Sequence, residues 1–282
     1  MANGSARSIW RVGLVVGVFG LAHAAAADPL QPHRAVYDLT LSSAEPSTSL
    51  ISASGRLVFE IGGSECDGYS VNFRNVTRVT DREGAQRVTD LRSQTFETLA
   101  PAVLSFAHQT HIDDTVAREI EGTARGRVDG IAIDISTPKS TEMKLGRAIF
   151  PTAHTRLILE AADAGERIIE ATVFDGGDEA NTLYETATVI GPGQTGLPGA
   201  SADEMAVLST VPDAANRTAW RLVISYFDAA AEEGERVPDY EITFTMLDNG
   251  VSYNVSFNYG SFTLSGELTE LMLTDAADCS DN

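Results

Sequence analysis

Strict alternation of apolar and polar residues is the feature that most restricts how this chain can fold. In "HRAVYDLTL" (residues 33–41), for example, Ala35, Tyr37 and Leu39 fall on one face of an extended strand. A period of two with turn residues between the runs is typical of antiparallel sheets with one buried face. The runs that show this alternation are residues 33–41, 55–61, 68–73, 87–97, 103–112, 118–127, 130–136, 167–175, 182–190, 219–228, 238–248, 251–259 and 261–273. We therefore expect a mainly β fold, an antiparallel open barrel of about 13–14 strands.

One segment, "FPTAHTRLILEAADAGER" (150–167), follows a helical period instead. Thr152 is a suitable N-cap and Gly165 a suitable C-cap, which predicts a single helix over about residues 152–164. Its expected apolar stripe consists of Leu157, Ile158, Ala161 and Ala162. The concave face of a curved sheet is the natural place for such a helix. If the helix fills the concavity, the interior is only a core. If it fills it partly, the remainder is a pocket for an apolar ligand.

Residues 191–217 are rich in Gly, Pro, Ala and Ser and show no sustained period. This composition predicts a long mobile loop. The alternating runs beyond it resemble a continuation of the same sheet, so we expect residues 28–282 to form one domain.

The first 27 residues have the pattern of a secretory signal peptide. Arg7 and Arg11 supply positive charge, an apolar run follows at 12–22, and small residues end at Ala27. The apolar run is short for a membrane span, so cleavage near Ala27 is expected rather than retention as an anchor. The mature chain is then a periplasmic protein without a transmembrane segment.

The chain is strongly acidic, with a formal net charge of −20. This charge argues against nucleic acid as a partner and against electrostatic attachment to anionic lipid surfaces. The acidic residues are unevenly distributed: residues 160–282 hold 23 acidic and four basic side chains. That half either faces a basic partner or simply keeps the protein soluble.

The chain has two cysteines, Cys66 and Cys279. In an oxidising compartment an even number of cysteines favours a disulfide, and here only one pairing exists. The alternatives are two free thiols or a reactive cysteine, but no histidine lies near either residue in the sequence and no CxxC motif is present.

Motifs for catalysis or metal binding are weak. His108 and His111 would point to opposite faces of a strand, and the acidic turn at 175–179 lacks the spacing of a calcium loop. His154 lies on the predicted helix and is expected to be a core residue. No nucleophile elbow, phosphate-binding loop or dinucleotide-binding glycine pattern occurs. We expect no catalytic residue, no metal site and no cofactor.

Several segments together resemble the envelope integrity protein B family of α-proteobacteria. They include "HRAVYDLTL", "GRLVFEIGGSECDGYSVNFRNVTRV", the predicted helix with the residues that follow it, "ISYFD" and the terminal cysteine. The resemblance covers about residues 32–279. It implies a periplasmic β-spiral around a helix, similar in shape to the lipoprotein carriers LolA and LolB, and a disulfide between Cys66 and Cys279. It also implies a role in maintaining the cell envelope and association with a tetratricopeptide-repeat protein, and it brings no catalytic residue.

Two hypotheses for function follow. The first is a non-catalytic periplasmic protein that supports envelope integrity by binding a protein partner through its outer surface. The second is a carrier that holds a lipid or lipoprotein acyl chain in its interior, with residues 191–217 as a gate. The residues that form either the packed core or the pocket are Tyr37, Phe59, Tyr69, Phe73, Phe106, Leu157 and Ile158. Aromatic residues at strand spacing are usually core, which favours the first hypothesis.

Overall fold

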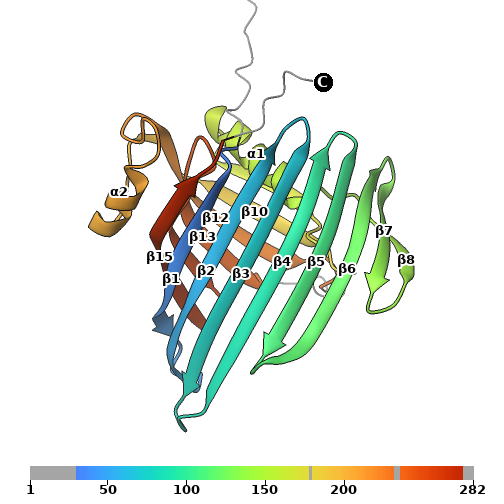
Figure 1. The fold of residues 1–282 in the computed structure, drawn as a ribbon, viewed down its shortest axis with the longest axis horizontal. Coiled ribbons are helices and arrows are strands. Elements are labelled where there is room, and N and C mark those ends of the chain that lie inside the picture. Colours follow the sequence, from blue (N-terminus) through green and yellow to red (C-terminus); the bar gives the residue numbers. More distant parts are fainter. Residues whose placement is uncertain (1–29, 178–179, 232–235, 276–282) are drawn as a thin grey trace, which may run out of the picture.

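The computed structural model describes residues 30–177, 180–231 and 236–275. The predicted signal peptide (1–27) and Cys279 lie outside these residues. Throughout the described part, strands predominate and join in one continuous sheet (Figure 1). The predicted class, a mainly β antiparallel open barrel, is confirmed.

The sheet contains 15 strands, against the 13–14 expected. They are β1 (His33–Ala44), β2 (Leu50–Ser64), β3 (Gly68–Asp81), β4 (Gln86–Leu99), β5 (Ala102–Ile112), β6 (Thr115–Arg127), β7 (Gly130–Thr137), β8 (Thr141–Leu145), β9 (Ile168–Val173), β10 (Tyr184–Ile190), β11 (Gln194–Thr195), β12 (Thr218–Asp228), β13 (Tyr240–Leu247), β14 (Ser252–Asn258) and β15 (Phe262–Leu273). Neighbours follow the order β8-β7-β6-β5-β4-β3-β2-β1-β15-β14-β13-β12-β10-β9, and β11 pairs with β12. The short strands β8 and β11 are the two that the alternation did not predict.

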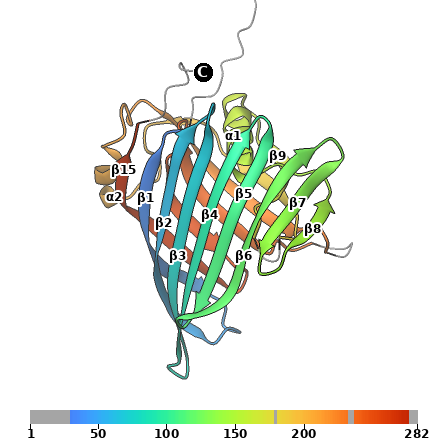
Figure 2. The same ribbon diagram turned by 45° about the vertical axis from the view of Figure 1, so that its right-hand side comes forward.

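The sheet curls until its end strands, β8 and β9, lie on the same side of the molecule (Figure 2). They do not pair with each other. Instead, the segment after β8 joins β9 in an isolated parallel bridge between Ile149 and Val173. The Ile149 N–H donates to the Thr172 carbonyl at 2.9 Å, and the Phe174 N–H donates to the Ile149 carbonyl at 3.0 Å. The barrel is therefore open along this seam and held there by two backbone hydrogen bonds.

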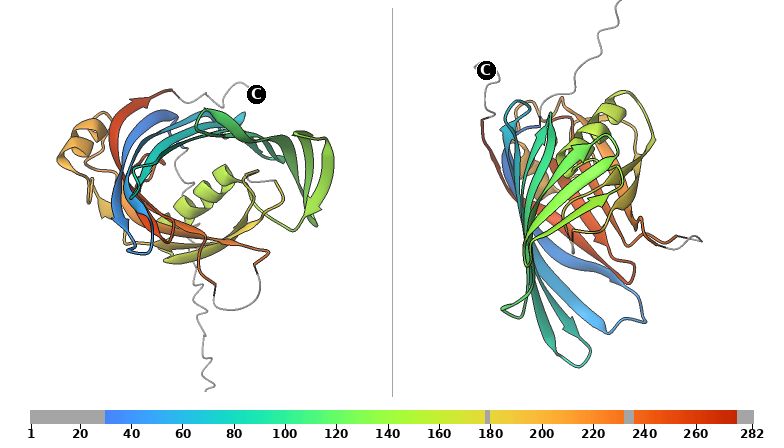
Figure 3. Two further views of the ribbon diagram at one scale, coloured as in Figure 1. Left: turned by 90° about the horizontal axis from the view of Figure 1, so that it is seen from below. Right: turned by 90° about the vertical axis from the view of Figure 1, so that its right-hand side faces the viewer.

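Helix α1 (Pro151–Asp163) lies inside the curled sheet, as seen from below in Figure 3. Its interior face is formed by Thr152, His154, Ile158, Leu159, Ala161 and Ala162, all buried. Leu157 was predicted to belong to this face, but it is 37% exposed. Leu159 takes its place, because the buried stripe runs through positions 158, 161 and 162 and leaves position 157 at its outer margin.

The start of α1 also differs from the prediction. The N-cap is Phe150, which offers no side-chain hydrogen bond, and Pro151 occupies the first turn. The first free N–H groups are satisfied by a residue from the sheet: the Glu97 carboxylate accepts from the Thr152 N–H at 2.7 Å and from the Ala153 N–H at 2.9 Å. Glu97 is 1% exposed, and burial raises the pKa of its carboxyl while the two donors lower it. A strand of the barrel thus fixes the position of the helix in the lumen.

Residues 191–217 are not an irregular loop, which corrects the prediction. They contain β11 and a second helix, α2 (Ala202–Leu208), outside the barrel beside β15 (Figure 1). The Glu204 carboxylate is 2% exposed and accepts from the backbone N–H groups of Ser201, Asn254 and Leu268 at 3.1, 2.8 and 3.2 Å. Pairing of β14 with β15 ends at Val255, so Glu204 satisfies donors that the sheet leaves free. The segment is docked on the outer surface, which does not fit the predicted role as a gate.

Candidate ligand-binding lumen

Three adjoining cavities surround the first turns of α1 inside the barrel. Their volumes are about 160, 270 and 230 Å³, and Thr155 lines all three. The first and third also share His33, Phe59 and Gly250, and the second and third share Ile242, Phe244 and Met246. The helix therefore fills only part of the lumen.

Three of the predicted interior residues, Tyr37, Phe59 and Phe73, line the cavity of about 230 Å³. Sheet register places them side by side, since Phe59 pairs with Phe73 across β2 and β3 and Tyr37 pairs with Leu57 across β1 and β2. Phe59 and Phe73 are only partly buried. The Tyr37 hydroxyl donates to the Ser252 carbonyl at 2.8 Å, so its ring presents an apolar face while its polar end is satisfied.

The other predicted interior residues have different positions. Tyr69, 1% exposed, and Ile158 both pack in the cluster around α1. Of the two, Ile158 also lines the cavity of about 270 Å³. Phe106 is buried in a separate cluster, with its ring 5.8 Å from that of Phe174. Leu157 lies on the exposed side of the helix. The set is thus divided between cavity lining, packed core and surface.

The opposite wall of the lumen comes from strands late in the chain. Its lining side chains are Ile224, Ile242, Phe244, Met246, Val255 and Phe257. They alternate along β12, β13 and β14, and this alternation indicates that they face the interior. Periodicity does not tell which apolar residues of a strand contact a cavity rather than another side chain.

Two histidines, His33 and His154, are among the polar residues that line the lumen. The His33 Nδ1–H donates to the Gln31 carbonyl at 2.7 Å, and burial lowers the pKa of this imidazole against the opposing effect of that bond. His154, 4% exposed, has its pKa lowered to about 4 by burial, and its Nε2 lies 3.3 Å from Thr186 Oγ1. Both imidazoles are therefore neutral near pH 7. The prediction of His154 as a core residue is confirmed.

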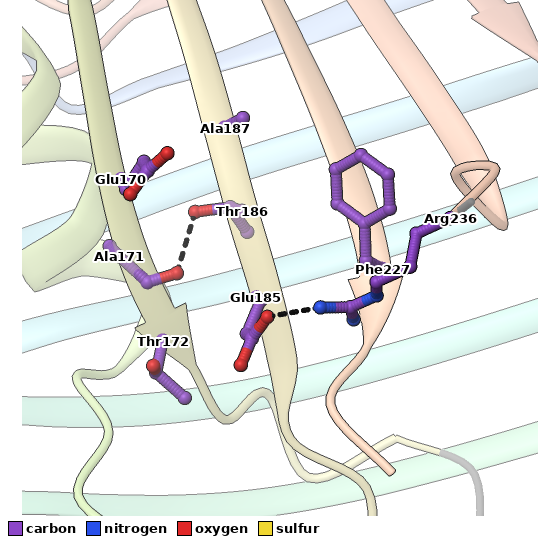
Figure 4. Close-up of a pocket in the computed structure, with 8 residues that line it drawn as sticks. All are labelled: Glu170, Ala171, Thr172, Glu185, Thr186, Ala187, Phe227 and Arg236. Atoms are coloured by element: carbon purple, nitrogen blue, oxygen red, sulfur yellow. Dashed lines mark hydrogen bonds and ion pairs between the residues drawn. The ribbon is translucent and has the colours of Figure 1, made fainter. Parts of the chain in front are cut away.

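A second concave region lies on the outer face of β9, β10 and β12 (Figure 4). It has a volume of about 630 Å³ and is lined by Glu170, Thr172, Glu185, Ala187, Phe227 and Arg236 among others. Arg236 forms an ion pair with Glu185 and lies over the Phe227 ring, 5.4 Å from its centroid. We call this region the outer groove.

The predicted disulfide involves one described residue. Cys66 lies in the exposed turn between β2 and β3, whereas Cys279 lies outside the described residues, so the pairing stays a prediction. The register supports it: Leu273 of β15 pairs with His33, and His33 pairs with Ile61 near the end of β2. Leu273 and Ile61 are thus two strand spacings apart, about 10 Å, which a six-residue segment spans when extended.

No helix in residues 30–177, 180–231 and 236–275 is long and apolar enough to cross a membrane. Over the same residues, no group of three His, Cys, Asp or Glu side chains is placed to hold a metal ion.

Comparison with known proteins agrees with the fold and with the resemblance in the sequence. The model of the EipB-like family matches residues 24–275. The chain is 34% identical over 274 residues to the cell envelope integrity protein EipB of Brucella abortus (strain 2308), a match that covers 97% of this chain and 93% of that protein. A solved β-barrel-like protein of unknown function, also from Brucella abortus, is similar in structure, with a TM-score of 0.81, 34% identity and coverage of 87% of this chain and 99% of that one. The chain belongs to the EipB-like family.

Proposed function

We propose that this protein is a non-catalytic periplasmic protein that supports cell envelope integrity by holding the apolar chain of an amphiphile in its lumen. One observation carries the proposal: three adjoining cavities remain beside α1, and partly exposed aromatic rings such as Phe59 and Phe73 line them. Ligand sites for small molecules are typically concave and mainly apolar, with a few polar groups. The name of the relative from Brucella abortus supports the link to the envelope.

The test compares two tryptophan substitutions on the same helix. Thr155→Trp fills space common to all three cavities, whereas Leu157→Trp adds the same ring on the exposed side of α1. Native mass spectrometry of protein purified from its host should detect bound lipid on the wild type and on Leu157→Trp, and little on Thr155→Trp. Absence of lipid from all three, with no uptake of an added fatty alcohol, would refute carriage in the lumen.

The cellular role is tested with the same pair of variants. A strain that lacks the gene should be more sensitive to detergent, and Leu157→Trp should restore resistance. Thr155→Trp, present at an equal level in the periplasm, should not. Equal rescue by both variants would show that envelope integrity does not depend on the lumen.

N-terminal sequencing of the exported protein tests the signal peptide. We expect the mature chain to start at Asp28.

A second candidate function is contact with a periplasmic protein partner, and the outer groove is the observation that favours it. The Glu170 carboxylate lies there beside the Glu185–Arg236 ion pair and the Phe227 ring, in a chain of net charge −20. Such a surface suits a basic segment of a partner. A photo-crosslinking residue at Ala187 should capture one defined protein in a salt-sensitive way. The same group at Ser256, outside the groove, is the control, and capture from both positions or from neither would argue against this candidate.

A further inference from the structure

Three tyrosines gather where β10, β12 and β13 line the lumen. Tyr226 and Tyr240 form a cross-strand pair whose rings stack with centroids 4.5 Å apart and an interplanar angle of 13°. Tyr184 meets each of them edge-on, with centroids 6.1 Å away in both cases. All three line the cavity of about 270 Å³, and none was predicted as a site residue.

Asp175 lies at the same end of the lumen, because the chain after β9 crosses from one wall of the barrel to the other. Phe174 packs on Phe106 of β5, and the His108 Nε2–H donates to the Asp175 carbonyl at 3.1 Å. Gly176 has a φ of +80° and lies so close to the Phe106 ring that an added Cβ would be 2.5 Å from a ring carbon. This crossing holds Asp175 at the boundary of the two cavities of about 160 and 270 Å³.

The Asp175 side chain has a carboxylate that the described chain does not neutralise. Its Oδ1 accepts the Gly177 N–H at 2.8 Å, and no Lys, Arg or His within the described ranges forms an ion pair with it. Burial, and then the negative charge of Asp175, raise the pKa of Tyr226. The pKa of Tyr240 is raised by burial, by the neighbouring Tyr226 and by Asp175. The phenols are therefore neutral near pH 7. Among the described residues that line this end of the cavity, Asp175 supplies the one negative charge, beside three aromatic rings.

The rest of the lining excludes an anionic head group. No lysine or arginine is among the described residues that line the three cavities. Their two histidines, His33 and His154, are neutral because burial lowers both pKa values. A phosphate or carboxylate placed here would meet Asp175 without a cation to pair with.

We infer that the Asp175 end of the lumen binds the ammonium group of an amphiphile, while the apolar wall of Ile242, Phe244 and Met246 takes its chain. A carboxylate pairs with a cation, and the faces of aromatic rings attract one, most strongly where water is excluded. The inference rests on the proposed carriage in the lumen and names the head group that the lumen selects.

The experiment is titration calorimetry with three eight-carbon probes: octyltrimethylammonium, octanol and octanoate. The wild type should bind octyltrimethylammonium at least about tenfold more tightly than octanoate, the effect expected of one desolvated cation contact. Asp175→Asn keeps the oxygen that accepts the Gly177 N–H, and it should remove most of this preference without changing the affinity for octanol. Tyr240→Leu should weaken octyltrimethylammonium several-fold more than octanol.

The net negative charge of the chain requires a matched control, because it attracts any cation. Asp163→Asn, at the exposed end of α1, changes the net charge by the same amount and should leave the preference intact. Equal losses in Asp163→Asn and Asp175→Asn, or no loss in Asp175→Asn, would overturn the inference. Octanol binding without a preference for ammonium would overturn it and leave the proposed function standing. Failure of all three probes to bind would overturn both.

Discussion

Replacement of Glu97 by glutamine tests whether a buried carboxylate from β4 holds α1 in place. In the wild type the two carboxylate oxygens accept two backbone N–H groups of the first helical turn, at 2.7 and 2.9 Å. Glutamine has one oxygen and an NH₂ group, so one N–H loses its acceptor and faces another donor. The substitution therefore leaves a buried polar group without a partner and removes a negative charge from the N-terminus of a helix.

The magnitude follows from these two losses. A buried donor without an acceptor costs about 1–3 kcal/mol, and a favourable charge at a helix N-terminus contributes about 0.3–2 kcal/mol. Glu97→Gln should lower the free energy of unfolding by about 2–4 kcal/mol, which for a chain of this size corresponds to a fall in Tm of roughly 6–12 °C. Urea unfolding and calorimetry measure both quantities.

The control for this prediction is Glu60→Gln, on the exposed face of β2, which should change the free energy of unfolding by less than about 0.5 kcal/mol. Hydrogen exchange gives a second measurement, since the Thr152 and Ala153 amides should lose protection in Glu97→Gln before the rest of α1. A variant as stable as Glu60→Gln, with unchanged protection of these two amides, would refute the capping role.

Three further predictions concern other parts of the fold. Burial lowers the pKa of His154 to about 4 from its usual 6.5, so the unfolded state binds the proton more readily and the free energy of unfolding should fall as the pH drops from 6.5 through 4. In urea unfolding, His154→Leu should lack about 3 kcal/mol of that fall. Parallel pH profiles of the variant and the wild type would contradict this prediction. Thiol labelling of unfolded, unreduced protein should leave Cys66 and Cys279 unmodified, whereas labelling of both would disprove the disulfide. Glu204→Ala leaves three backbone N–H donors without their acceptor and should release α2, seen as proteolysis near residue 205 at protease levels that spare the wild type.

Sequence patterns predicted the sheet because its two faces differ. Alternation such as that of Ala35, Tyr37 and Leu39 is imposed by the pleat of a strand with one side in the lumen, and it located 13 of the 15 strands. The two that it missed, β8 and β11, have five and two residues, too few for a period to be visible.

Sequence patterns did not predict helix α2, although the sequence contains a recognisable start signal for it. Ser201 and Glu204 form a capping box, in which the Ser201 hydroxyl accepts the Glu204 N–H at 3.1 Å. The glycines and prolines around this seven-residue helix outweighed that local signal. By contrast, the cap of α1 by Glu97 joins residues 55 positions apart, and no local pattern reports such a contact.

The candidate site was predictable only in part. Tyr37, Phe59 and Phe73 were found because they belong to long alternating strands near the start of the chain. Phe106 has the same pattern but packs under the crossing segment at Gly176, and Asp175 enters the lumen through that same crossing. Which residues face a cavity is decided by contacts between distant segments, so composition and period could not separate them.

Crystallography with a bromine-labelled ligand is the most direct test of whether the lumen holds the chain of an amphiphile. Crystals grown with 12-bromododecyltrimethylammonium should show anomalous scattering from bromine inside the barrel, in the cavity bounded by Phe59, Phe73 and Phe257. Electron density for the alkyl chain should run from there past Thr155. Crystals saturated with the compound that show no bromine in the lumen, or bromine only on the outer surface, would contradict the account.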